Sequence, residues 1–272
     1  IPFGALIVST LIFPLVRKSL SFKTTYVASF LGYATHGLLD ACTSYGTLLL
    51  WPFSNERITW NNISIVDPLL TIPALIFLAV AVKTSRRRFS FLAVGWIVSY
   101  LALGLVQYER ALSSGIKLAQ SRGHSAERMT LKPSFGNLIL WKSIYQYEDS
   151  FYVDAIRAGR TLTWCPGETI KIFDYQYHLP DLEKNSQQMK DIERFRWFSQ
   201  DYLGFDDDKN LVTDVRYSMV PNQIAPMWGL VIDEQQGTNE HAVWWTSRVL
   251  DDESLTLFKE MLLSDKCAQS PT

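Results

Sequence analysis

The first hundred or so residues contain long apolar runs broken only by short charged clusters, and this feature constrains the fold most. A helix needs roughly twenty mostly apolar residues to cross the hydrocarbon layer of a bilayer. Four segments are predicted to be membrane-spanning helices: Ile1–Val16, Tyr26–Leu50, Pro68–Val82 and Phe89–Val106. The third segment is short, so a tilted or partly re-entrant helix is an alternative there.

The composition changes near Tyr108, after which charged residues are scattered as they are on a water-facing surface. The sequence therefore predicts two domains, a transmembrane helical bundle over residues 1–107 and an extramembranous α+β domain over residues 108–272 with more strand than helix. Alternating, β-branched and aromatic runs predict strands, and the spacing of apolar residues in Gln187–Gln200 predicts a helix. The predicted strands include Leu138–Trp141, Ser150–Val153, Thr169–Phe173 and His241–Trp245.

Two basic clusters predict the orientation of the chain. Arg17, Lys18 and Lys23 lie between the first two predicted spans, and Arg86–Arg88 lie between the last two. Because short loops rich in Lys and Arg stay in the cytoplasm, both connections are expected inside. The loop from Trp51 to Asp67 and the C-terminal domain are then expected outside.

Charge and cysteine content exclude other classes of partner and site. The 26 basic residues are balanced by 27 acidic ones and are not gathered along one stretch, so no nucleic-acid partner is expected. The three cysteines form no C-x-x-C pair, which argues against a thiolate metal site. One disulfide, between Cys165 and Cys267, is an option if the domain lies outside the cytoplasm.

The second predicted span carries a polar stripe. Its members follow one another at helical steps of four, four, three and four: Gly32, His36, Asp40, Thr43 and Thr47. Ionisable residues inside a span are costly and usually functional. His36 and Asp40 can present a nitrogen and an oxygen to one ion, or hydrogen-bond each other. The structural alternative is a buried pair that holds helices together.

Asp67 precedes Pro68 at the start of the third predicted span. Aspartate is a favoured N-cap residue and proline a favoured first helical residue, so capping alone explains this pair. A second, catalytic role for Asp67 is the alternative, because it is expected on the side of the membrane toward which Asp40 lies.

Three segments together carry a family resemblance: H-G-L-L-D-A-C-T-S-Y-G at His36–Gly46, W-P-F-S at Trp51–Ser54, and I-V-D-P-L-L-T at Ile65–Thr71. They resemble the YdjM-type family of LexA-regulated, membrane-bound, predicted metal-dependent hydrolases. The resemblance implies a multi-pass protein of the bacterial inner membrane. Members carry an earlier H-R-G-x-T-H-S element that this chain lacks. The chain also opens directly in an apolar run, so it is expected to be part of a longer protein whose missing histidines complete the metal site.

The function implied by the resemblance is hydrolysis of a phosphoester or lipid-linked substrate by a metal-activated water. His36 and Asp40 are the expected ligands of a divalent ion, with zinc favoured and manganese or iron as alternatives. Asp67 joins them as a candidate catalytic residue. Thr43 and Arg57 are candidate substrate-binding residues, the latter as a partner of a phosphate. Two other functions stay open: a transporter or channel that uses the His36–Asp40 stripe for ion passage, and a membrane scaffold in which the stripe is structural.

Overall fold

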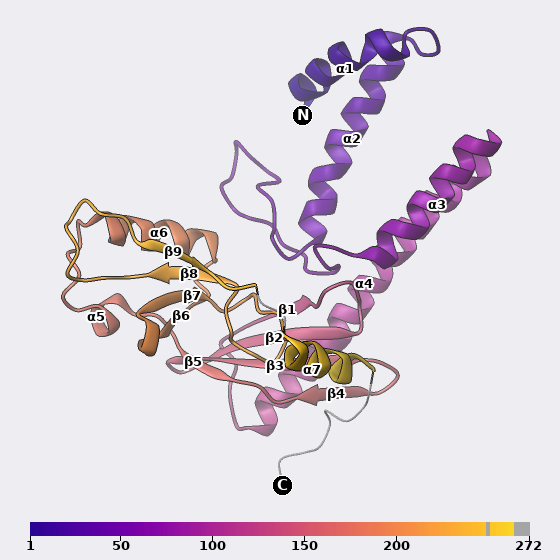
Figure 1. Ribbon diagram of the computed structural model, residues 1–272. Helices are drawn as coiled ribbons and strands as arrows, with labels where there is room; N and C mark the ends of the chain where they lie inside the picture. The colour runs from indigo at the N-terminus through magenta and orange to yellow at the C-terminus, as the bar shows by residue number, and fades with distance from the viewer. Residues whose placement is uncertain (249–250, 264–272) are drawn as a thin grey trace. The chain divides into compact units, whose positions relative to one another are not determined.

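The computed structural model describes residues 1–248 and 251–263. The chain divides into two compact units, Ile1–Leu101 and the residues from Ala102 onward. Four helices lead the sequence, and nine strands with three further α-helices follow among the described residues (Figure 1). The boundary between the units falls inside the fourth helix.

The first unit is helical. It contains α1 (Pro2–Val16), α2 (Phe22–Cys42), α3 (Pro68–Thr84) and the first part of α4 (Arg87–Ser121). α1 and α2 form a hairpin in which the Ser21 hydroxyl accepts a hydrogen bond from the Thr24 N–H and so caps α2. Ala5 and Ser9 of α1 are fully buried, since small side chains let two helices approach closely.

The prediction of four membrane-spanning helices was wrong. Among the described residues, one helix, α4, is long and apolar enough to cross a bilayer, and it contains the fourth predicted span. α1 and α3 are apolar but have only 15 and 17 residues. At ~1.5 Å per residue they reach about 22 to 26 Å, short of the roughly 30 Å hydrocarbon layer. α2 has 21 residues, but its charged and polar side chains lower its hydropathy too far.

α2 also ends earlier than the second predicted span. Thr43 has extended backbone angles, and its N–H and its hydroxyl both donate to the Asp40 carbonyl oxygen, at 3.0 and 2.8 Å. The chain therefore leaves the helix after Cys42 instead of continuing to Leu50. Thr43 and Thr47 are not part of a helical stripe with His36 and Asp40, as the sequence had predicted.

The second unit contains two antiparallel sheets, so the expectation of a sheet-rich C-terminal region is confirmed. The first sheet has the order β1-β2-β3-β4, with β5 pairing with β3, and the second has the order β6-β7-β8-β9. The first comprises β1 (Arg128–Pro133), β2 (Leu140–Tyr147), β3 (Ser150–Ala158), β4 (Leu162–Cys165) and β5 (Thr169–Lys171). The second comprises β6 (Leu203–Asp206), β7 (Leu211–Asp214), β8 (Trp228–Val231) and β9 (Val243–Thr246). The four predicted strands correspond to β2, β3, β5 and β9.

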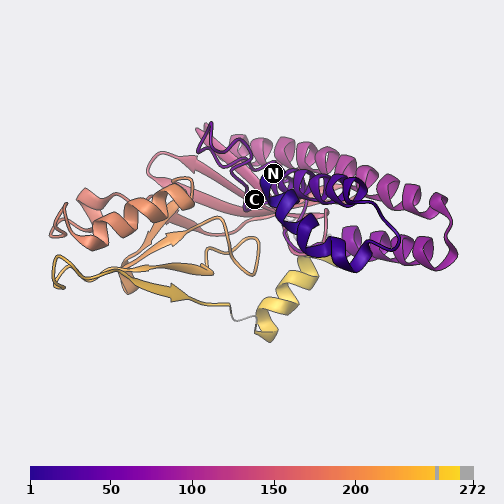
Figure 2. The ribbon, with the colours of Figure 1, turned by 90° about the horizontal axis from the view of Figure 1, so that it is seen from above.

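Helices cover the faces of these sheets. The end of α4 packs on one face of the first sheet through Ala111, beside Trp141 and Ile156. The opposite face meets α7 (Asp252–Leu263), whose Met261 belongs to the same buried cluster as Leu140 and Ala155. The predicted helix is α6 (Gln187–Phe198), which covers a face of the second sheet (Figure 2). A short helix, α5 (Tyr175–His178), and a 3-10 turn, η1 (Asp207–Lys209), complete the described elements.

Candidate functional site

His36 and Asp40 contact each other on one face of α2. The distance from His36 Nδ1 to Asp40 Oδ2 is 3.0 Å, so the prediction that i,i+4 spacing pairs them is confirmed. Their side chains are 76% and 49% exposed. The pair is therefore accessible to a small molecule, in contrast to the buried pair of the structural alternative.

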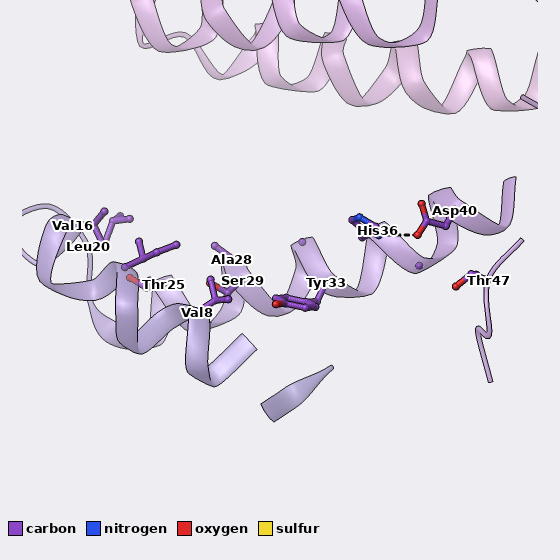
Figure 3. A pocket seen from close by; sticks show the side chains of 13 residues that line it. Val8, Val16, Leu20, Thr25, Ala28, Ser29, Tyr33, His36, Asp40 and Thr47 are labelled. Carbon is purple, nitrogen blue, oxygen red and sulfur yellow. Dashed lines mark ion pairs between the residues drawn. The ribbon is translucent and has the colours of Figure 1, made fainter. Parts of the chain in front are cut away.

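The two residues lie at one end of an elongated groove. The groove has a volume of about 800 Å³ and is lined mainly by apolar side chains. It runs along α2 from Leu20 at one end to Asp40 and Thr47 at the other, with Tyr33 between them (Figure 3). α1 supplies part of the wall through Val8, Ile12 and Val16, and α2 supplies most of the remainder through Thr25, Ala28, Ser29, Gly32, Tyr33, His36, Gly37 and Asp40. The groove is thus apolar along most of its length and polar at one end.

The chain after α2 turns back and stabilises the polar end of the groove. The N–H groups of Asn62 and Ile63 donate to the Cys42 carbonyl oxygen, and the N–H of Trp60 donates to that of Ala41. These bonds satisfy carbonyl groups that a helix end leaves without partners. Thr47 pairs with Ile58 across the same loop, which brings Thr47 to the groove although it has left the helix.

Asp67 is fully engaged as a helix cap. Its Oδ1 accepts from the N–H groups of Leu69 and Leu70, and the Tyr100 hydroxyl donates to the carboxylate. The side chain is 5% exposed. The capping prediction is confirmed, and Asp67 does not line the groove that His36 and Asp40 border.

The two candidate substrate-binding residues lie near the turn that follows α2. Thr43 donates its hydroxyl hydrogen to the Asp40 backbone, as described above, and is not among the groove residues. The Arg57 guanidinium donates to the carbonyl oxygens of Tyr45 and Gly46, at 2.8 and 3.4 Å. Both contacts shape the loop around Asp40.

The described residues do not form a complete metal site. No group of three or more His, Cys, Asp or Glu side chains with suitable geometry occurs in the described parts of the chain. His36 and Asp40 offer two donor atoms, whereas a protein zinc site takes at least three protein ligands. The imidazole and carboxylate are nonetheless ligand types that zinc accepts.

The groove itself was not foreseen from the sequence. Val8 and Ile12 belong to an apolar run, and such a run indicates only that its residues are buried or face lipid. It does not indicate which residues line a groove. Their position beside α2 follows from the α1–α2 hairpin, for which the turn at Arg17–Ser21 and the Ser21 cap are the available sequence signals.

Comparison with known proteins finds a family match for the N-terminal part of the chain. Residues 1–111 match the family model described as "YdjM inner membrane protein", which confirms the resemblance seen in the sequence. The match covers all of the groove residues, His36, Asp40, Asp67 and the helix α3. No curated protein and no solved structure matches the chain.

Proposed function

We propose that this chain, whose residues 1–111 match the model of the YdjM family of inner membrane proteins, is a membrane-bound hydrolase acting on a phosphoester that is linked to a lipid. The observation that carries this proposal is the contact between His36 and Asp40 at the polar end of an apolar groove. The lipid chain would lie along the groove, and the bond to be cleaved would lie beside the imidazole.

His36 and Asp40 can supply base catalysis by themselves. When the imidazole is neutral and its Nδ1–H donates to Asp40 Oδ2, the other ring nitrogen, Nε2, is left as an acceptor. That nitrogen can take a proton from a water molecule attacking phosphorus, and the carboxylate stabilises the imidazolium that forms. The exposed position of the pair gives water access to it.

A divalent ion, with zinc favoured, belongs to the proposal as the family resemblance implies. A His36 ring nitrogen and an Asp40 oxygen would hold it, together with at least one ligand beyond this pair, and the ion would then replace the imidazole as the group that activates water. The ion would supply a more acidic water and a positive charge beside the phosphate. Thr43 and Arg57 are proposed to act on the substrate side, Arg57 by pairing with phosphate oxygens.

The proposed orientation places the C-terminal domain outside the cytoplasm. Arg86–Arg88 stand at the start of α4, the candidate crossing helix, and positive charge favours the cytoplasmic side. One crossing by α4 then carries the following residues outside. Cys165 is disulfide-bonded, a state typical of extracytoplasmic proteins, whereas Cys267, the other cysteine of the expected pair, lies outside the described residues. A phosphatase reporter fused after Thr272 should be active, and a reporter active only in the cytoplasm would overturn this orientation.

Hydrolysis is tested on the full-length protein in detergent micelles that contain phosphatidic acid or a polyprenyl diphosphate. Phosphate release should fall at least 100-fold in His36→Ala and Asp40→Asn, the range expected for loss of a general base. His124→Ala, a histidine of the second unit, serves as the matched control and should retain activity. Comparable hydrolysis of a water-soluble aryl phosphate would contradict the role of the lipid groove, and absence of release from every lipid would contradict the hydrolase.

Metal content gives a separate measurement. Zinc measured by mass spectrometry in the purified wild type should fall in Asp40→Asn and remain in His124→Ala. Asn keeps the shape of Asp and an acceptor oxygen but removes the negative charge that offsets a divalent ion. Equal metal content in wild type and Asp40→Asn, on protein that elutes as one folded species, would favour a structural role for the pair.

A further inference from the structure

The second unit contains a buried lysine in contact with a serine. Lys142 of β2 is 4% exposed, and its Nζ lies 2.7 Å from Ser218 Oγ and 2.7 Å from the Gln223 carbonyl oxygen. Ser218 follows β7 and is half-buried. Both oxygens that contact the lysine are uncharged.

The neighbouring carboxylates are engaged by other groups. Asp214 accepts two hydrogen bonds from the Arg216 guanidinium, at 2.8 and 2.7 Å, and Glu168 accepts one from the Ile224 N–H at 2.6 Å. A second lysine, Lys132, stands directly opposite Lys142 on β1 and is also buried. The lysine therefore contacts neutral oxygens in a region that already holds other positive charges.

This environment favours the neutral amine. Burial lowers the pKa of Lys142 to about 7, although the negative charges of Glu168 and Asp214 act in the opposite direction. Removing a charged ammonium from water is costly, so a buried lysine gives up its proton more readily. A lysine that is partly neutral near pH 7 has the lone pair that a general base needs.

We propose that Ser218 and Lys142 form a serine–lysine dyad that hydrolyses carboxylic esters or amides. A nucleophile and a base within hydrogen-bond reach are the geometric requirement for such a dyad, and the 2.7 Å contact meets it. In this structure Lys142 Nζ donates to Ser218 Oγ and the Ser218 hydroxyl donates to the Val220 carbonyl oxygen at 2.7 Å, so the hydroxyl turns toward Nζ when the neutral amine takes its proton. The dyad is independent of His36 and Asp40.

The reaction balances with water as the second reactant. Ser218 Oγ attacks the carbonyl carbon of the substrate while its proton passes to the neutral Lys142 Nζ. The bond to the leaving alcohol or amine breaks, and the leaving group takes that proton from the ammonium, which leaves Ser218 acylated. Water then attacks the acyl carbon, gives a proton to Nζ, and the serine oxygen recovers that proton as the carboxylic acid departs.

A fluorophosphonate probe tests the dyad on the full-length protein in detergent. The wild type should form a covalent phosphonate ester at Ser218 with release of fluoride, located by peptide mass spectrometry. The labelling rate should rise with pH through a midpoint near 7, because the neutral lysine is the base. Ser218→Ala should not be labelled, and Lys142→Met should lose at least 100-fold in rate.

Ser134→Ala is the matched control, since Ser134 is another half-buried serine of this unit with two hydrogen-bond partners, Leu140 and Asn137, and no lysine at its hydroxyl. It should label like the wild type. Folding of Lys142→Met is checked by circular dichroism, and if it misfolds, the pH profile of the wild type decides. An unlabelled Ser218 in folded wild type, a flat profile between pH 6 and 8, or wild-type labelling of folded Lys142→Met would each overturn the dyad.

Discussion

The Tyr100 hydroxyl lies 3.0 and 2.9 Å from the two carboxylate oxygens of Asp67. This contact joins the N-cap residue of α3 to the middle of α4. The same carboxylate caps two backbone N–H groups, so one buried side chain holds the start of one helix and the side of another. The arrangement positions α3 without using any residue of the groove.

Replacing Tyr100 with Phe should destabilise the first unit. The change removes the donor that satisfies a buried carboxylate, and such a loss typically costs about 1 to 3 kcal/mol. The melting temperature of the full-length protein in detergent should fall. Tyr33→Phe is the control, because that hydroxyl belongs to a residue that is 45% exposed. An equal fall in both variants would contradict the role of the Asp67 contact.

Arg122→Met should destabilise the second unit more than the loss of an exposed ion pair does. Arg122 at the end of α4 donates two hydrogen bonds to Asp154 of β3, at 2.8 and 2.7 Å, and Asp154 is 1% exposed. Leaving that carboxylate without its cation should cost about 3 kcal/mol. Lys171→Met breaks the exposed pair with Asp149 and should leave the melting temperature unchanged. Similar shifts in the two variants would argue against the buried pair.

Gly46→Ala should disrupt the loop beside the groove. Gly46 has a φ of +72°, and a Cβ there would lie 2.3 Å from Thr59 Cγ2 and 2.9 Å from the Ile58 carbonyl oxygen. Gly123 has a similar φ of +75° but open space around it. Gly123→Ala should cost about 1 kcal/mol from backbone strain alone, whereas Gly46→Ala should cost more and lower activity at the groove. Equal melting temperatures would show that the loop adapts to the added atom.

The stability of the second unit should rise with pH between about 7 and 10. Burial lowers the pKa of Lys142 to about 7, below the value of about 10.4 expected in the unfolded chain. Between these two values the unfolded chain binds more protons than the folded one, so the free energy of unfolding increases with pH. Thermal melts across this range should show the increase in the wild type and a flatter profile in Lys142→Met. A wild-type curve that falls over this interval would contradict the lowered pKa.

The sequence predicted local features better than the extent of the helices. The i,i+4 spacing of His36 and Asp40 and the Asp-Pro pair at residues 67–68 each specify short-range geometry, and both are confirmed. The second predicted span extends to Leu50 because Thr43 and Thr47 continue the helical steps of the polar stripe. What ends the helix is the Thr43 hydroxyl on the Asp40 carbonyl, a contact that hydropathy does not register.

The long-range contacts could not be predicted from the sequence. Nothing in the spacing of residues brings Lys142 to Ser218, because Lys142 lies on β2 and Ser218 lies in the segment between β7 and β8, and the two meet only when these parts of the second unit pack. The groove depends likewise on which face of α1 meets α2, and an evenly apolar helix such as α1 does not specify its contact face. The strand positions were predictable because alternation is a local pattern, whereas their pairing order was not.

The backbone hydrogen bonds from residues 60–63 to the end of α2 have a consequence for where the length of this loop can change. Insertions near the tip of the loop, around Phe53, leave those bonds in place, since that residue is exposed and takes no part in the Thr47–Ile58 pairing. An insertion between Ile58 and Asn62 would shift the residues that hold the Ala41 and Cys42 carbonyls. Differences in length should therefore be tolerated at the tip of the loop and not between Ile58 and Asn62.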